Sequence, residues 1–109
     1  MKHLLVVLTE PVEGREDEYN DYYEHLHLDE VLATTPLVSA QRFRLTDEQG
    51  LKCPLPYLAI YEVEADDPTS LLPALNATRP QRVQSDALNR RTAGAWVFSE
   101  IGPKHTRKD

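Results

Sequence analysis

The stretch YNDYYEHLHLDEVL, residues 19–32, brings together the side chains best suited to chemistry. An imidazole with its ordinary pKa of about 6.5 takes up or releases a proton near neutral pH. His27 could therefore enolise a β-dicarbonyl compound or deprotonate a phenol. Tyr23, or Tyr22, could donate a hydrogen bond to the oxyanion that develops. The alternative is structural, with His27 capping a helix end or bonding to a backbone carbonyl.

The tyrosines follow a helical spacing. Tyr19, Tyr22, Tyr23 and Leu26 stand at positions i, i+3, i+4 and i+7, which places them on one face of a helix. Aromatic residues at this spacing usually pack in a core, yet each buried phenol hydroxyl also needs a hydrogen-bond partner. We therefore expect Tyr19 to pack and Tyr22 and Tyr23 to reach toward a cavity, with Tyr19 and Tyr22 among the residues that contact the substrate.

A third candidate acid or base, His3, lies at the start of an apolar stretch and alternates with Leu5 and Val7. Alternate residues of a strand share one face. If that face looks toward the helices, His3 could meet the tyrosines across a pocket that Leu5 and Val7 also line. If it looks toward a partner subunit, His3 is an interface residue. A position so near the terminus is also compatible with simple exposure.

Positive charge is concentrated late in a chain whose net charge is −6. These arginines could attract a carboxylate-bearing substrate, or they could pair with neighbouring acids on a solvated helix face. The four residues concerned are Arg79, Arg82, Arg90 and Arg91.

The elements that must position these side chains alternate in type. Short apolar strands are expected over residues 3–9, 37–45, 57–63 and 95–101. A helix is expected from the acidic residues 16–18 to a break near position 27, resuming over 29–33. A second helix should begin at 67–68, be kinked or divided by Pro80, and continue over 81–91. The order β-α-β-β-α-β predicts an α+β, ferredoxin-like domain with a four-stranded antiparallel sheet over residues 1–103, followed by a polar tail over 104–109.

The predicted strands are apolar on both faces for much of their length. Such strands need cover on both sides of the sheet, and two helices can cover only one side. The simplest partner for the other side is a second copy of the chain across a two-fold axis. We therefore expect a homodimer packed sheet to sheet.

Composition excludes several classes of function. The acidic surface disfavours nucleic acid as a partner, and no apolar run approaches the roughly 20 residues that span a bilayer. We expect a cytoplasmic protein. His25 and His27 lie two apart and point to different sides of a helix, so no metal is expected. With only four glycines and no Gly-rich phosphate loop, no nucleotide cofactor is expected either.

The chain resembles the dimeric α+β barrel proteins, and among them the EthD-like branch. The similarity rests on KHLLVVL, GREDEYNDYYEHLHLDEVL, SAQRFRL and SDALNRRTAGAWVF, which together cover most of the chain. Tyr22-Tyr23 and His27-Leu28 match the tyrosine pair and His-Leu of such relatives, while Asp29 stands where they carry proline. The resemblance also implies that Arg42 and Arg44 are barrel or interface charges, balanced by Glu62 or Glu64.

The resemblance implies a pocket for small, often aromatic molecules. The expected function is a cofactor-independent enzyme that uses acid/base chemistry on an aromatic or polyketide-like carbonyl compound, as a cyclase, isomerase or monooxygenase. In that expectation His27 transfers the proton, Tyr23 and Tyr22 orient the oxygen, and His3 is an auxiliary base. The alternative is a non-catalytic dimer that binds a small molecule in the same pocket.

Overall fold

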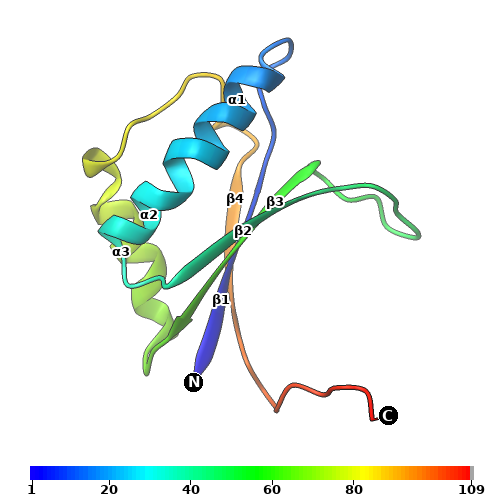
Figure 1. Ribbon diagram of the computed structural model, residues 1–109, viewed down its shortest axis with the longest axis vertical. Helices are drawn as coiled ribbons and strands as arrows, with labels where there is room; N and C mark the ends of the chain where they lie inside the picture. The colour runs from blue at the N-terminus through cyan, green and yellow to red at the C-terminus, as the bar shows by residue number, and fades with distance from the viewer. Residues whose placement is uncertain (109) are drawn as a thin grey trace.

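The computed structural model describes residues 1–108, and its centre is a four-stranded sheet in the order β2-β3-β1-β4 (Figure 1). All three neighbouring pairs are antiparallel. The α+β class and the antiparallel sheet predicted from the sequence are therefore confirmed, and the strand order is compatible with a ferredoxin-like fold. The strands are β1 (Lys2–Thr9), β2 (Ser39–Arg44), β3 (Tyr57–Glu64) and β4 (Gly94–Ser99).

The first helix is continuous rather than the pair of segments predicted from the sequence. Its middle turn is π-helical, with the backbone N–H of Leu28 donating to the carbonyl oxygen of Tyr23, five residues earlier. A wider turn absorbs an extra residue without breaking the helix, so the predicted break near His27 is wrong. The same turn removes Leu26 from the tyrosine stripe, and this side chain is 38% exposed. The three parts are α1 (Glu16–Tyr22), η1 (Tyr23–His27) and α2 (Leu28–Thr34).

The second helix begins where the sequence predicted. Asp67 caps it by accepting a hydrogen bond from the backbone N–H of Thr69. The helical continuation predicted over residues 81–91 is wrong, because that backbone bonds elsewhere. The N–H of Val12 donates to the oxygen of Ala87 at 2.7 Å, and further along Asn89 bonds to Glu10. The helical parts are η2 (Pro68–Ser70), α3 (Leu71–Ala77) and η3 (Arg79–Gln81).

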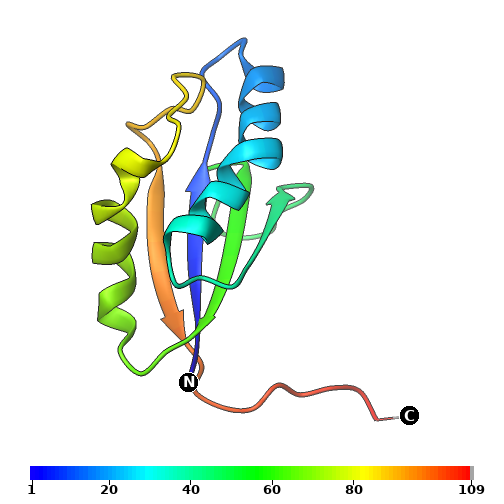
Figure 2. The same cartoon turned by 60° about the vertical axis from the view of Figure 1, so that its left-hand side comes forward.

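The two helices lie on the same side of the sheet and form one layer (Figure 2). The core forms between them and the sheet, and its largest fully buried side chains are Tyr19, Tyr61, Leu5, His3 and Val31. No helix within residues 1–108 covers the opposite face of the sheet (Figures 1 and 2). One face of the sheet therefore packs against the helices and the other does not, although the strands are apolar on both faces.

After β4 the chain leaves the sheet, and residues 101–108 are exposed (Figure 1). Within residues 1–108, no helix has the length and apolar character needed to cross a membrane.

Candidate functional site

A cavity of about 390 Å³ lies between the helix-covered face of the sheet, the π-helical turn, α3 and the irregular segment 82–93. Its inner wall comes from the strands and is apolar apart from Thr9 and Tyr61, whereas its other polar groups come from the helical parts and from segment 82–93. The lining includes Leu5, Val7, Tyr22, Tyr23, His27, Tyr61, Arg79, Arg82, Gln84 and Arg90.

Most of the predicted site residues meet in this cavity. The lining includes all three groups expected around the reacting atoms of a substrate, namely His27, Tyr23 and Tyr22. Leu5 and Val7, predicted to contact substrate, also line it. Tyr19 and His3 do not line it, and the structure gives each of them other partners.

The π-helical turn brings Tyr22 and His27 together. In an α-helix, with about 100° of rotation per residue, side chains five positions apart point about 140° away from each other. Here the two rings stack, with their centroids 5.2 Å apart and 26° between their planes. Tyr23 meets the same imidazole edge to face, with centroids 4.9 Å apart.

The hydrogen bonds of Tyr22 fix the tautomer of His27. The single hydroxyl proton of Tyr22 is donated to the carbonyl oxygen of Val83 at 2.7 Å. The Tyr22 oxygen lies 3.1 Å from His27 Nδ1, so Nδ1 must carry the proton and donate it to that oxygen. The other ring nitrogen, Nε2, is then unprotonated.

This Nε2 atom is available to a ligand. It makes no hydrogen bond within residues 1–108. It is also not sealed from solvent, because Arg82 Nε is the only sealed polar side-chain atom without a partner in that range. Burial lowers the pKa of His27 to about 4, and the charges of Arg82 and Arg79 act in the same direction. The imidazole is therefore neutral at pH 7, with a free lone pair on Nε2.

Two phenols in the cavity remain protonated at neutral pH. Burial is the main reason that the pKa of Tyr23 lies well above its ordinary value of 10, and the neighbouring Tyr61 adds to this effect. Burial likewise raises the pKa of Tyr61 to about 12. Both hydroxyls therefore keep the proton that a hydrogen bond to an oxyanion requires. Tyr61 was not among the site residues predicted from the sequence, although its alternation with Ala59 and Val63 marks it as inward-facing.

Tyr19 packs in the core as expected. It is fully buried, and its hydroxyl bonds to the hydroxyl of Thr9. The guanidinium of Arg42 lies over its ring and, at 4.8 Å from the centroid, over that of Tyr23. Arg42 also donates to Asn20 Oδ1 at 2.7 Å.

The predicted balance of Arg42 by Glu62 or Glu64 is therefore wrong. The side chain of Arg42 points toward the first helix, where Glu24 is its ion-pair partner at 3.5 Å. Glu64 pairs instead with the N-terminal amine at 3.1 Å. The signal for this arrangement is the alternation of β2, which places Arg42 on the same side as the tyrosines.

His3 has a structural role at the end of the sheet. It lies on the helix-covered face but is fully buried, and both ring nitrogens are used. Nε2 donates to the carbonyl oxygen of Ala65 at 2.9 Å, so Nδ1 accepts from the hydroxyl of Ser99 at 2.7 Å. The geometry gives no support to an auxiliary catalytic role for His3.

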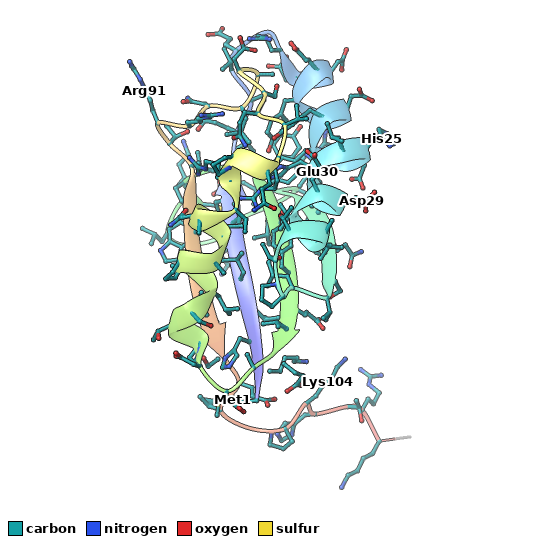
Figure 3. The ribbon with its side chains drawn as sticks, turned by 90° about the vertical axis from the view of Figure 1, so that its left-hand side faces the viewer. Met1, His25, Asp29, Glu30, Arg91 and Lys104 are labelled. Atoms are coloured by element: carbon teal, nitrogen blue, oxygen red, sulfur yellow. The ribbon has the colours of Figure 1, made fainter. Side chains whose placement is uncertain are left out.

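Three of the four late arginines line the cavity. Arg82 is buried, at 7% exposure, whereas Arg79 and Arg90 are exposed residues of its rim. Arg91 points away from the body of the protein (Figure 3). His25 also projects outward from the first helix (Figure 3).

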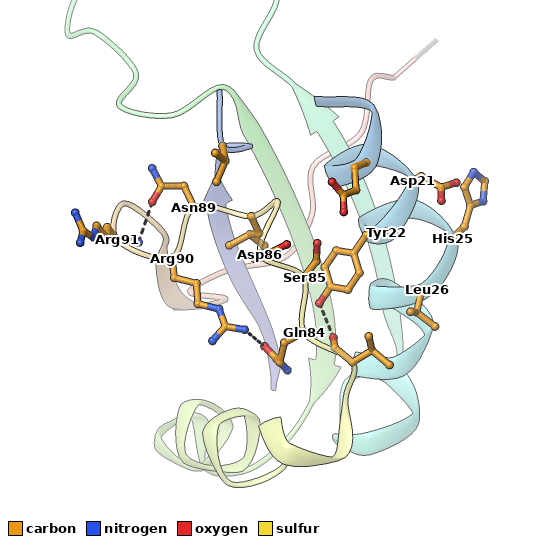
Figure 4. A pocket seen from close by; sticks show the side chains of 14 residues that line it. Asp21, Tyr22, His25, Leu26, Gln84, Ser85, Asp86, Asn89, Arg90 and Arg91 are labelled. Atoms are coloured by element: carbon orange, nitrogen blue, oxygen red, sulfur yellow. Dashed lines mark hydrogen bonds between the residues drawn. The ribbon is translucent and has the colours of Figure 1, made fainter. Parts of the chain in front are cut away.

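A more open groove of about 1090 Å³ lies outside the cavity, between the first helix and segment 83–91 (Figure 4). Tyr22 lines both spaces, and its bond to Val83 ties the helix to the segment that separates them. In the groove, burial raises the pKa of Tyr22, and a hydrogen bond from Arg15 lowers the pKa of Asp86. His27, with its lowered pKa and free Nε2, lines the cavity and not the groove. The cavity is therefore the better candidate for chemistry.

Comparisons with known proteins add no assignment, since the chain matches no protein-family model, no curated protein and no solved structure. Within residues 1–108, no group of three or more His, Cys, Asp or Glu side chains is placed to hold a metal ion.

Proposed function

We propose that this chain is a cofactor-independent enzyme that removes a proton from a small aromatic or polyketide-like carbonyl compound. The observation that supports this most is the state of His27, whose Nδ1–H is held by Tyr22 while Nε2 keeps a free lone pair at the cavity. Cyclisation, isomerisation and oxygenation of such compounds all begin with proton removal, so the proposed reaction is of one of these types. The proposal agrees with the resemblance to the EthD-like branch.

The other lining residues have complementary roles in this proposal. His27 Nε2 accepts the proton, and the neutral phenol of Tyr23 donates a hydrogen bond to the enolate oxygen. Tyr61 is a second donor of the same kind. Leu5 and Val7 contact the apolar body of the substrate from the sheet. Tyr22 acts as a positioning residue because it fixes the tautomer of the base.

Proton exchange tests the proposal without knowledge of the full reaction. A panel of aryl ketones and unsaturated lactones, whose α-protons exchange slowly on their own, is incubated with the protein in D2O and followed by NMR. We expect exchange faster than in buffer for at least one class of compound, and a loss of about 10²-fold or more in His27→Gln. The matched control is His25→Gln, which changes an exposed histidine of the same helix and should exchange at the wild-type rate.

Exchange at the buffer rate across the panel, or an undiminished rate in His27→Gln, would contradict the enzymatic proposal. The second candidate function, a non-catalytic binding protein, has one observation in its favour. A His27 pKa of about 4 makes the imidazole a weak proton acceptor in the empty cavity. Thermal stabilisation by panel compounds without any exchange would favour this second function.

We also propose that the chain forms a homodimer of the dimeric α+β barrel type through the uncovered face of the sheet. On that face Leu4 is paired with Phe98 and Val6 with Trp96. Phe98 is 57% exposed and Trp96 46% exposed, and Phe43 on β2 is 44% exposed. A contiguous apolar surface of this kind is typical of an interaction site.

Light scattering tests the dimer at micromolar concentration. We expect twice the monomer mass for the wild type and the monomer mass for Phe98→Glu, since a buried carboxylate opposes association. The control is Ile101→Glu, which changes an exposed residue just beyond β4 and should remain dimeric. A monomeric wild type would contradict the proposal.

A further inference from the structure

The charge around the cavity is unbalanced. Arg79, Arg82 and Arg90 line one small space, and none of the ion pairs within residues 1–108 includes them. In a protein with a net charge of −6, acidic partners are plentiful, so three arginines without one are a local feature of this site. The sequence left two roles open for these arginines. They do not pair with neighbouring acids on a solvated helix face, which leaves attraction of a carboxylate-bearing substrate.

Arg82 is the buried member of the group. Its Nη1 donates to the hydroxyls of Thr34 and Thr78, and its Nη2 to the carbonyl oxygen of Leu75. All three acceptors are neutral, and Nε is sealed from solvent with no partner. A buried charge held only by neutral groups costs free energy unless a counter-ion compensates it. The side chain is thus fixed in place with its charge unpaired.

Glu30 does not supply this counter-ion. Burial and the charge of Arg79 lower the pKa of Arg82, and the opposing charge of Glu30 does not reverse this. The Glu30 carboxylate instead accepts the backbone N–H of Val83 through Oε1 at 2.9 Å. At the rim, Arg90 donates to Gln84 Oε1 at 2.9 Å, which is again a neutral acceptor (Figure 4). The positive field of the arginines is therefore directed at whatever occupies the cavity.

We propose that the substrate carries a carboxylate, which binds at the mouth of the cavity to Arg79 and Arg90, with Arg82 behind it. This inference rests on the proposed function and names the substrate class, an aromatic or polyketide-like carboxylic acid. The planar guanidinium matches the two oxygens of a carboxylate, and the apolar inner wall suits a ring. The lining includes no glycine-rich loop of the kind that cradles a phosphate.

A bound carboxylate would also strengthen the base. The charges of Arg82 and Arg79 help to keep the pKa of His27 at about 4. The other ionisable groups facing the imidazole are the phenols of Tyr22 and Tyr23, which are neutral at pH 7, with Glu30 beyond Tyr22. An anion that compensates the arginines raises the pKa of His27 toward its ordinary value. Proton transfer would then be faster for a carboxylate-bearing substrate than for the corresponding neutral compound.

Matched pairs of acid and amide test the carboxylate site by direct binding. The probes are benzoate, 4-hydroxybenzoate, salicylate and 2-naphthoate, each compared with its amide by isothermal titration calorimetry. We expect at least one acid to bind ten-fold or more tightly than its amide, with a preference that declines as salt is added. Arg79→Met and Arg90→Met should each reduce that preference at least several-fold.

The control is Arg91→Met, which removes a neighbouring arginine outside the cavity and should keep the preference. Since Arg79 and Arg90 are exposed, their substitution leaves the core intact, and the test does not depend on the folding of an Arg82 variant. Equal binding of acid and amide in every pair, equal losses in Arg91→Met, or tighter binding of phenyl phosphate than of benzoate would overturn the inference.

The outcomes separate the carboxylate site from the enzymatic proposal. A preference for acids without α-proton exchange would support the site and contradict the enzyme. Exchange on neutral ketones with no preference for acids would support the enzyme and overturn the site.

Discussion

The buried, neutral state of His27 makes folding stability depend on pH in a defined way. The pKa is about 4 in the folded protein and 6.5 in the ordinary, unfolded environment. Between these values the unfolded chain binds a proton that the folded chain does not, so stability falls as the pH falls. The stabilising effect is fully present above pH 6.5 and is lost as the pH drops through 4.

The size of this effect follows from the shift. With one pKa unit equal to about 1.36 kcal/mol, the shift is worth roughly 3 kcal/mol of unfolding free energy between pH 7 and pH 4. His27→Gln removes the titrating group while keeping a polar side chain. The free energy of unfolding of this variant should therefore fall by about 3 kcal/mol less than that of the wild type over the same range.

Urea unfolding at pH 7, 6, 5 and 4 measures the difference, with the protein concentration held constant because association also changes apparent stability. His25→Gln is the matched control and should follow the wild type, since His25 is exposed on the same helix. Parallel curves for wild type and His27→Gln would refute the reasoning. Such a result would mean that His27 is as accessible to protons in the folded chain as in the unfolded one.

Two further predictions concern packing. Tyr19→Phe leaves the buried hydroxyl of Thr9 without its partner and should lower the free energy of unfolding by about 1–3 kcal/mol in urea, whereas no loss would contradict the hydrogen bond. In Gly94→Ala the new Cβ would lie 2.5 Å from Cη2 of Trp96, so the half-exposed indole must move. The fluorescence emission of the only tryptophan should shift, with a stability loss of at most about 1 kcal/mol, and an unchanged spectrum would show that the ring does not lie over Gly94.

The four strands and their order along the chain could be predicted because each is an apolar run with clear stops in the local sequence. The meeting of Tyr22, Tyr23 and His27 was also expected, but its geometry was not. Hydrophobic periodicity assumes a regular α-helix, and it carries no information on where one backbone hydrogen bond skips to a residue five positions away. The π-helical turn is the feature that stacks Tyr22 on His27, and it became visible only in three dimensions.

Segment 82–93 shows a second limit of sequence reasoning. Its composition allowed a helix, but its backbone bonds to residues 10–12, which are distant in sequence. Tertiary pairing of this kind overrides local propensity. Because the segment folds over the cavity, it delivers Arg82 and Arg90 to the site. The sequence had shown only that arginines were numerous in this part of the chain.

The proposed chemistry depends on an unprotonated His27 Nε2 at the cavity. The most direct measurement is a long-range ¹H–¹⁵N NMR correlation of the histidine side chains at pH 7, with His27 identified by its absence from His27→Gln. We predict a neutral imidazole with its proton on Nδ1, and loss of this single tautomer in Tyr22→Phe, which removes the acceptor. A proton on Nε2, or a charged ring at pH 7, would contradict the account.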